Sequence, residues 1–360
     1  MKRTFTNCLA TFSALIVLMS SSSAFGQAKI TMDDDRWVTI GGGLRTSFRS
    51  TETFADSDTY SKSFVLDSVR LYVNSQLHKD FKVEFNTEYD GSGDIMVLDA
   101  VVKYQPSPYF NVWMGRHLVP TDRANLDGPY FLNAYDYPGL VSRYPSIFAG
   151  RDNGMSVNGE VKEGKFKYAF GVYNGMESVG TADSLLYGGR LVANFLDPES
   201  GYYNSSTYYG EKDVLALGWA FNYQSDVVPT VGEPESFFGY NFDLLFEKNL
   251  MNAGVVSIEG AFYDYDYNDS LAFGDGSAFL AQGSFLINKE LGIGKIQPMI
   301  RYQDFRDTSL LDIGAGYIIR GHNARLHFTY SQFETPITVG GTPVDWQKSN
   351  QFTFGTQFQF

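Results

Sequence analysis

The chain has 360 residues, of which 43% are hydrophobic and 19% are charged, and it contains 30 Phe, 24 Tyr and a single Cys. Its formal net charge of -13 excludes a nucleic-acid binder that works through a basic face, and its one cysteine excludes a disulfide scaffold. After the N-terminal segment, no run approaches the roughly 20 apolar residues that a membrane-spanning helix needs, which excludes a helical membrane protein.

Residues 1–26 have the order of a secretory signal peptide. Two basic residues are followed by an apolar stretch from Cys8 to Met19 and by the small-residue site Ala24-Phe25-Gly26. We expect cleavage after Gly26, with Ala28 as the second choice. Cleavage removes the only thiol, which suits export into an oxidising compartment. The mature part, residues 27–360, is then predicted to form one domain.

From residue 36 onward, segments of about ten residues alternate apolar and polar side chains, and Gly, Asn, Asp or Pro separate them. The apolar faces are rich in aromatic residues near the segment ends, whereas the opposite faces carry Gly, Ser, Asn, Gln and charged residues. This pattern is typical of a transmembrane barrel, with apolar side chains toward lipid and polar ones toward a lumen. In hydrocarbon every peptide group must be paired, and a closed sheet leaves no edge. The predicted fold is therefore an all-β, closed antiparallel transmembrane β-barrel.

The alternation predicts about sixteen strands, with fourteen or eighteen as open alternatives. The expected ranges are 36–50, 63–78, 81–90, 95–105, 109–119, 151–161, 165–175, 185–196, 213–224, 236–248, 254–265, 277–288, 295–306, 310–320, 324–333 and 346–360.

Two connections between these strands are unusually long. The third outer one, residues 120–150, has its own aromatic content, and we expect it to fold into the lumen as a constriction loop that carries Arg123 and Arg143. The alternative is an outer cap or a subunit-contact loop. Residues 197–212 form a Tyr-rich connection where a short periplasmic turn is expected. This connection is either an elaborated turn or a pair of strands that the pattern does not reveal.

The C-terminal sequence FTFGTQFQF places Phe352, Phe354, Phe358 and Phe360 on one face of a strand. A terminal strand that ends on an aromatic residue is typical of the signal that outer-membrane assembly machinery recognises. With the signal peptide, it predicts the outer membrane of a Gram-negative bacterium, with lipid and lipopolysaccharide around the barrel.

Alternation also predicts which charged side chains face the lumen. The basic residues placed inside include Lys82, Lys167 and Arg320, and the predicted carboxylates are about as numerous. Rings of basic residues favour anions, but pairing with carboxylates across the sheet is an equally good interpretation. The candidate pore-lining or selectivity residues are Arg45, Arg70, Lys103, Arg116, Arg123, Arg143, Arg190, Arg301 and Arg325.

The stretches SVRLYVNSQLHKDFKVEFNTEYD and VLDAVVKYQPSPYFNVWMGRHLVP, with GRDNGMSVNGEV further along, resemble the phosphate-selective porin O and P type of outer-membrane porins. The resemblance implies a sixteen-stranded, usually trimeric diffusion channel with a folded-in third loop and a long Tyr-rich connection. It also implies Arg116 beside the waist and Arg70, Arg190 and Arg301 in an arginine ladder. The dense lysine cluster of that family is not visible, which leaves phosphate selectivity open.

Catalytic motifs such as HExxH, GxSxG and the phosphate-binding glycine loop are absent from the sequence, and no cofactor or metal site is expected. The function predicted is passive diffusion of small hydrophilic solutes, among them inorganic anions such as phosphate, through a homotrimeric porin that is not an enzyme. Two alternatives belong to other classes. One is a barrel that sheathes a periplasmic partner, as in an electron conduit. The other is a barrel-wall hydrolase, in which Ser331 would accompany His327.

Overall fold

The computed structural model describes residues 28–53, 59–89, 91, 93–175, 184–227, 235–266, 274–339 and 342–360. The predicted signal peptide lies outside the described residues. None of the helices in this part of the chain has the length and apolar character needed to cross a bilayer.

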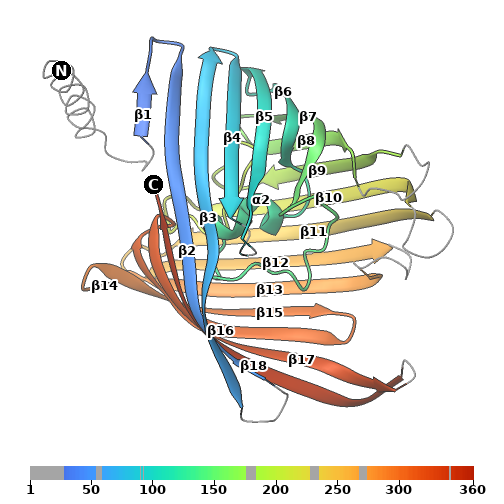
Figure 1. The fold of residues 1–360 in the computed structure, drawn as a ribbon. Helices are drawn as coiled ribbons and strands as arrows, with labels where there is room; N and C mark the ends of the chain where they lie inside the picture. Colours follow the sequence, from blue (N-terminus) through green and yellow to red (C-terminus); the bar gives the residue numbers. More distant parts are fainter. Residues whose placement is uncertain are drawn as a thin grey trace, which may run out of the picture.

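A single closed antiparallel sheet forms a barrel of sixteen long strands, and two short strands extend it (Figure 1). The strands are β1 (Ala28–Thr31), β2 (Trp37–Glu52), β3 (Tyr60–His78), β4 (Phe81–Tyr89), β5 (Ile95–Ser107), β6 (Phe110–Leu118), β7 (Arg151–Val161), β8 (Phe166–Tyr173), β9 (Leu186–Asn194), β10 (Val214–Val227), β11 (Glu235–Asn249), β12 (Gly254–Asp266), β13 (Gly276–Ile287), β14 (Glu290–Leu291), β15 (Gly294–Phe305), β16 (Thr308–Arg320), β17 (Ala324–Val339) and β18 (Thr342–Gln359).

Each long strand pairs with the next one along the chain, and β18 closes the ring by pairing with β2, where Phe354 lies opposite Phe48. The short strands β1 and β14 pair with the first residues of β2 and β15. The predicted closed barrel and its sixteen wall strands are confirmed. The expected strand end at 333 and the expected strand start at 346 are wrong, because β17 and β18 continue pairing as far as Val339 and Thr342.

The two faces of the wall differ as the alternation predicts. On β18, the side chains of Phe352, Phe354 and Phe358 are 40–47% exposed on the outside, whereas Thr353 and Gln357 are buried inside. Polar groups and charges therefore lie within the ring, and aromatic and aliphatic groups cover its outer surface.

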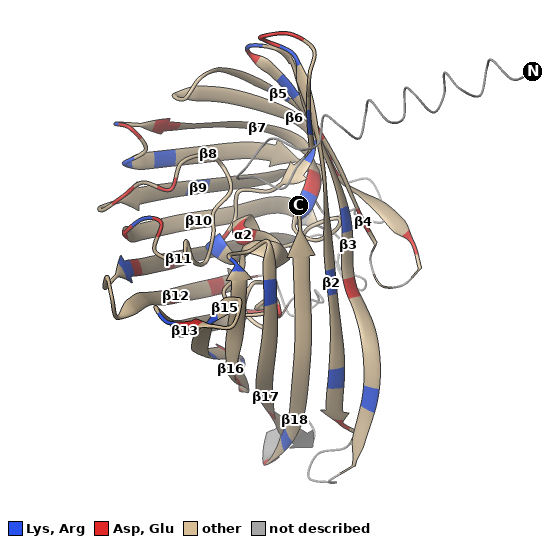
Figure 2. Ribbon diagram, turned by 90° about the vertical axis from the view of Figure 1, so that its left-hand side faces the viewer, with Lys and Arg blue, Asp and Glu red and all other residues tan. Residues whose placement is uncertain are grey.

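One helix lies inside the ring. The connection from β6 to β7, residues 119–150, contains α2 (Arg123–Phe131), and the strands enclose this helix in the views of Figures 1 and 2. Gly128 has φ 60° within α2, and Pro129 follows it, so the helix is kinked at that point. The sequence pattern predicted an inward loop here but no helix.

Candidate functional site

The segment 119–150 is held across the lumen by arginines from strands on different sides of the ring. Guanidinium groups of β2, β9, β15 and β17 donate hydrogen bonds to backbone carbonyls of the segment, which lie outside any regular hydrogen-bond ladder. The pairs are Arg45 with Tyr135, Arg190 with Thr121 (3.1 Å), Arg301 with Asp136 (2.7 Å), and Arg325 with Leu132 (2.5 Å) and Tyr130 (3.2 Å). These four predicted pore residues therefore anchor the inward segment.

Two glycines of the wall allow aromatic rings of this segment to lie directly on the strands. A Cβ atom on Gly43 of β2 would come within 2.7 Å of the Tyr130 ring, and one on Gly355 of β18 within 2.5 Å of the Tyr135 ring. The positions need glycine for this close approach, since both have ordinary extended backbones. The wall is thus shaped to receive the segment.

Most inward basic residues form ion pairs with carboxylates, as the second interpretation of the sequence proposed. The pairs are Arg70 with Glu88 (2.6 Å), Lys103 with Glu84, Arg123 with Glu199, Arg151 with Asp99 (3.2 Å), Arg190 with Asp243 (2.6 Å) and Arg301 with Asp312 (2.8 Å). Their side chains are nearly all buried, so each pair also satisfies groups that water does not reach. A continuous ladder of unpaired arginines is not present in the described part of the lumen.

Arg45 and Arg325 differ from these pairs. Within the described residues, neither guanidinium lies at ion-pair distance from a carboxylate, and both side chains are buried. Arg45 lies 4.2 Å from the Tyr135 ring centre, and Arg325 donates to Gln357 at 2.9 Å. On the β17–β18–β2 side of the lumen, these two guanidinium groups are thus held by neutral partners.

Two basic residues are not where the sequence placed them, and a third lies on the predicted inward segment but does not line a passage. Arg116 faces outward, because it shares the outer face of β6 with Met114, and its guanidinium donates to the Val97 carbonyl and the Asn153 side chain. Arg320 was predicted inside but is exposed at the end of β16, where the register with β17 shifts. Arg123 is buried in its ion pair and does not line an open passage.

Arg143, the other predicted charge of the inward segment, lies in its later part. Its guanidinium carbon is 4.9 Å from the centre of the Phe305 ring of β15, and its backbone N–H donates to the Tyr265 hydroxyl at 3.1 Å. Arg143 therefore anchors the segment near the outer ends of β12 and β15.

The Tyr-rich connection between β9 and β10, residues 195–213, also folds into the barrel. It contains no strand, so the elaborated turn is correct and a missed pair of strands is wrong. Glu199 pairs with Arg123 of α2, and Glu247 of β11 accepts hydrogen bonds from the backbone of Tyr208 and Gly210. Ser205, Ser206 and Thr207 are buried. In the sequence, the length and Tyr content of this connection and the family resemblance pointed to an elaborated turn.

Burial changes the titration of acidic groups in these two connections. It raises the pKa of Asp122 to about 6, although the Tyr263 hydroxyl donates to this carboxyl at 2.8 Å. Burial also raises the pKa of Asp127 well above its ordinary value, against the attraction of Arg123. Burial also acts to raise the pKa of Glu199. The attraction of Arg123 outweighs this effect, so the pKa of Glu199 lies below its ordinary value.

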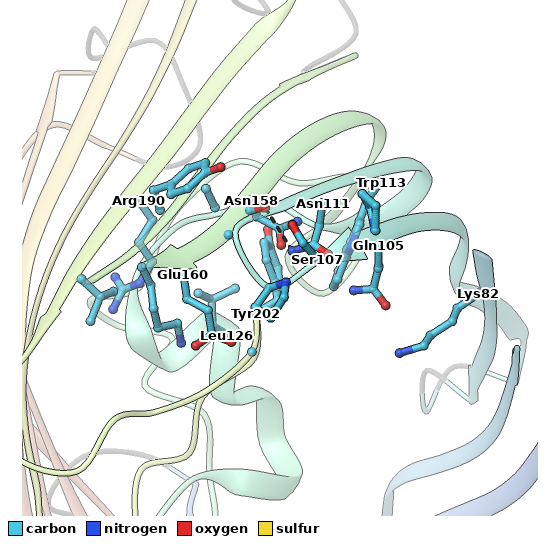
Figure 3. Close-up of a pocket in the computed structure, with 18 of the residues that line it drawn as sticks. Lys82, Gln105, Ser107, Asn111, Trp113, Leu126, Asn158, Glu160, Arg190 and Tyr202 are labelled. Atoms are coloured by element: carbon cyan, nitrogen blue, oxygen red, sulfur yellow. Dashed lines mark hydrogen bonds between the residues drawn. The ribbon is translucent and has the colours of Figure 1, made fainter. Parts of the chain in front are cut away.

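The two inward connections separate two cavities. The outer cavity, of about 390 Å³, is lined by Arg45, Arg70, Asn125 and the later part of 119–150. The cavity at the other end, of about 450 Å³, is lined by Leu126, by strands β4 to β9 and by the connection 195–213 (Figure 3). Asn125 and Leu126, which are neighbours on α2, thus line opposite cavities, and the helix lies between them.

The groups that a hydrolase would need are not assembled. Ser331 donates to Asp312 at 2.6 Å, and neither ring nitrogen of His327 has a hydrogen-bond partner among the described residues. No group of His, Cys, Asp and Glu in this part of the chain has the arrangement of a metal site.

The sequence matches no protein-family model and no curated protein. The fold is similar to that of Salmonella typhi OmpF in complex with daunomycin, with a TM-score of 0.60, 10% identity, and coverage of 92% of this chain and 100% of that one. The outer membrane channel DcaP of Acinetobacter baumannii gives a TM-score of 0.58 at 11% identity, covering 92% of this chain and 99% of that one. The trimer form of OmpT, an outer membrane protein of Vibrio cholerae, gives 0.56 at 15% identity, covering 91% and 100%.

At these identities the likeness concerns the fold. It supports the closed antiparallel barrel described above. The resemblance to phosphate-selective porins is not confirmed and stays a prediction.

Proposed function

We propose that the barrel is an outer-membrane porin that passes small hydrophilic solutes by passive diffusion. The observation that carries this proposal is the narrowing of a polar lumen between two cavities by segments held with buried arginines. The apolar outer face fits a lipid and lipopolysaccharide environment, because charges inside the ring are shielded from hydrocarbon. Export by a signal peptide cleaved after Gly26 belongs to the same proposal.

The mechanism is size exclusion combined with placement of charge. A solute enters the outer cavity, passes the zone between α2 and the wall, and leaves through the cavity on the periplasmic side. No covalent step is involved. Because the inward segments are attached by side-chain hydrogen bonds, the width of the passage depends on those anchors.

For the sign of selectivity, we propose a modest preference for small inorganic anions, of which phosphate is one. Arg45 and Arg325 support it, since neither guanidinium forms an ion pair with a carboxylate within the described residues. The paired charges elsewhere limit the preference. The reversal potential in a salt gradient across a planar bilayer tests this directly. Cation selectivity would contradict the anion preference, and absence of conductance would contradict the channel.

A homotrimer is proposed from the trimer form of OmpT, whose fold is similar. The mass of the detergent-solubilised protein, measured by light scattering, tests it. A barrel that sheathes a periplasmic partner is disfavoured, because the chain's own segments 119–150 and 195–213 occupy the middle of the lumen.

A further inference from the structure

The turn that follows β13, residues 288–295, exposes large apolar side chains at the periplasmic end of the barrel. Ile293 and Leu291 are 74% and 61% exposed, and Met251 of the neighbouring turn is 82% exposed. The two turns are joined, because the side chain of Asn288 donates to the Met251 carbonyl at 3.0 Å. They therefore present one apolar surface, and an exposed apolar surface of this kind marks a site of interaction.

A bulge directs residues 288–295 away from the line of β13. Between the last pair of β13 with β15 and the first pair of β14 with β15, five residues (285–289) lie opposite three (296–298). Unmatched residues bend a hairpin, and Pro298 on the shorter side has no N–H group to pair with them. Figure 1 shows β14 projecting past the ends of the neighbouring strands.

The bend brings the turn to the outer side of the wall. Tyr317 of β16 lies on the same outward face as Ile313, which is 47% exposed. The Tyr317 hydroxyl donates to the Leu291 carbonyl at 2.5 Å and accepts from the N–H of Ile293 at 3.0 Å. Gly292 has φ 67°, and a Cβ atom there would come within 3.2 Å of that hydroxyl. The tip of the turn is thus attached to a side chain that faces away from the lumen.

The apolar surface of the turn is continuous with the outer face of the wall. Ile287 at the end of β13 and Ile300 of β15 are 37% and 52% exposed on that face. Tyrosines are enriched where a membrane meets water, so Tyr317 and the turn bonded to it match the level of the lipid headgroups. Lys289 is exposed on the same turn, where its ammonium group can reach lipid phosphates while its aliphatic part lies on apolar surface.

We propose that the turn 288–295, with Met251 beside it, inserts into the inner leaflet of the outer membrane, and that its binding partner is the phospholipid surface. Ile293 and Leu291 enter the boundary between headgroups and acyl chains, and Lys289 stays among the phosphates. Because interfacial anchors set how a membrane protein sits in the bilayer, this turn fixes the depth of the β13–β16 side. The proposal rests on the membrane location proposed above and not on conduction.

The test uses single cysteines, since the predicted mature chain has no thiol of its own. Ile293→Cys is labelled with an environment-sensitive fluorophore, and the barrel is reconstituted in phosphatidylcholine vesicles that contain a nitroxide-bearing phosphatidylcholine. We expect a nitroxide close to the headgroup to remove most of the fluorescence, and a nitroxide at the methyl end of the acyl chain to remove less. Ile300→Cys, in the middle of the wall, should show the reverse order.

Glu163→Cys with the same label is the matched control, because Glu163 is exposed in the polar turn between β7 and β8 at the same end of the barrel. Neither nitroxide should quench it. A second measurement needs no label: Ile293→Asn should lower the urea midpoint for unfolding from vesicles, whereas Glu163→Gln should leave it unchanged.

Equal quenching at residues 293 and 163 would overturn the proposal. So would a label at residue 293 that is shielded only as the number of barrels per vesicle rises and is never quenched, since that result would place a second copy on this surface. Quenching at residue 300 without quenching at residue 293 would refute the inserted turn alone. Absence of quenching at both would refute the membrane location as well.

Discussion

Glu247 is the anchor whose removal should open the passage from the periplasmic side. Its buried carboxylate accepts hydrogen bonds from the backbone N–H groups of Tyr208 and Gly210, at 2.9–3.0 Å, and from the hydroxyls of Thr207 and Ser257, both at 2.7 Å. Glu247→Ala leaves the two backbone donors without an acceptor. At about 1–3 kcal/mol for each, docking of the connection 195–213 is weakened by roughly 2–6 kcal/mol. The equilibrium constant for docking should then fall by roughly 30-fold to 10⁴-fold.

The assay is single-channel recording in planar bilayers together with limited proteolysis of the folded barrel. Glu247→Ala should give a larger or fluctuating conductance and new cleavage between residues 200 and 210. Glu247→Gln is the graded control, because its amide oxygen still accepts from the backbone while its NH₂ group donates to the hydroxyls. Glu163→Ala, in an exposed turn, controls for loss of a carboxylate. A Glu247→Ala protein with unchanged conductance and unchanged resistance to the protease would refute the anchoring role.

Three other substitutions test separate parts of the lumen. Gly355→Val should overpack against the Tyr135 ring, lower the free energy of unfolding by about 1–3 kcal/mol and raise conductance; an unchanged urea midpoint would contradict it. Arg45→Ala should lower the anion-to-cation permeability ratio by up to roughly sevenfold, because one charge at about 7 Å in water changes the energies of an anion and a cation by about 0.6 kcal/mol each, in opposite directions. Arg116→Ala should leave the reversal potential unchanged, because Arg116 faces outward. Burial raises the pKa of Asp122 from 3.8 to about 6, so native stability should fall as pH rises from about 4 to 6. Asp122→Asn should remove that loss, up to about 3 kcal/mol, in urea unfolding at pH 4 and pH 7.

Strand positions could be predicted because side-chain direction alternates strictly along a barrel wall. The range 151–161 corresponds residue for residue to β7, and the inward position of Arg45 and Arg325 follows from the same periodicity. Arg116 was included for its resemblance to a family position, whereas the outward Met114 two residues earlier already indicated the opposite face.

The partners of the inward arginines could not be predicted. Arg123 pairs with Glu199, 76 positions later in the chain, and both reach the middle of the lumen on irregular connections. Periodicity says which face a strand residue occupies, but it carries no information about how far a connection extends into the space that the strands enclose.

The ion pair between α2 and the Tyr-rich connection affects how the barrel responds to an electric field. A transmembrane voltage falls mainly across the narrowest part of a water-filled pore, and it does work of roughly 2.3 kcal/mol per elementary charge for each 100 mV. Arg123 and Glu199 carry opposite charges on the two segments that meet there. When both segments shift together, the work on one charge cancels the work on the other, so this pair adds no net gating charge as long as it remains intact.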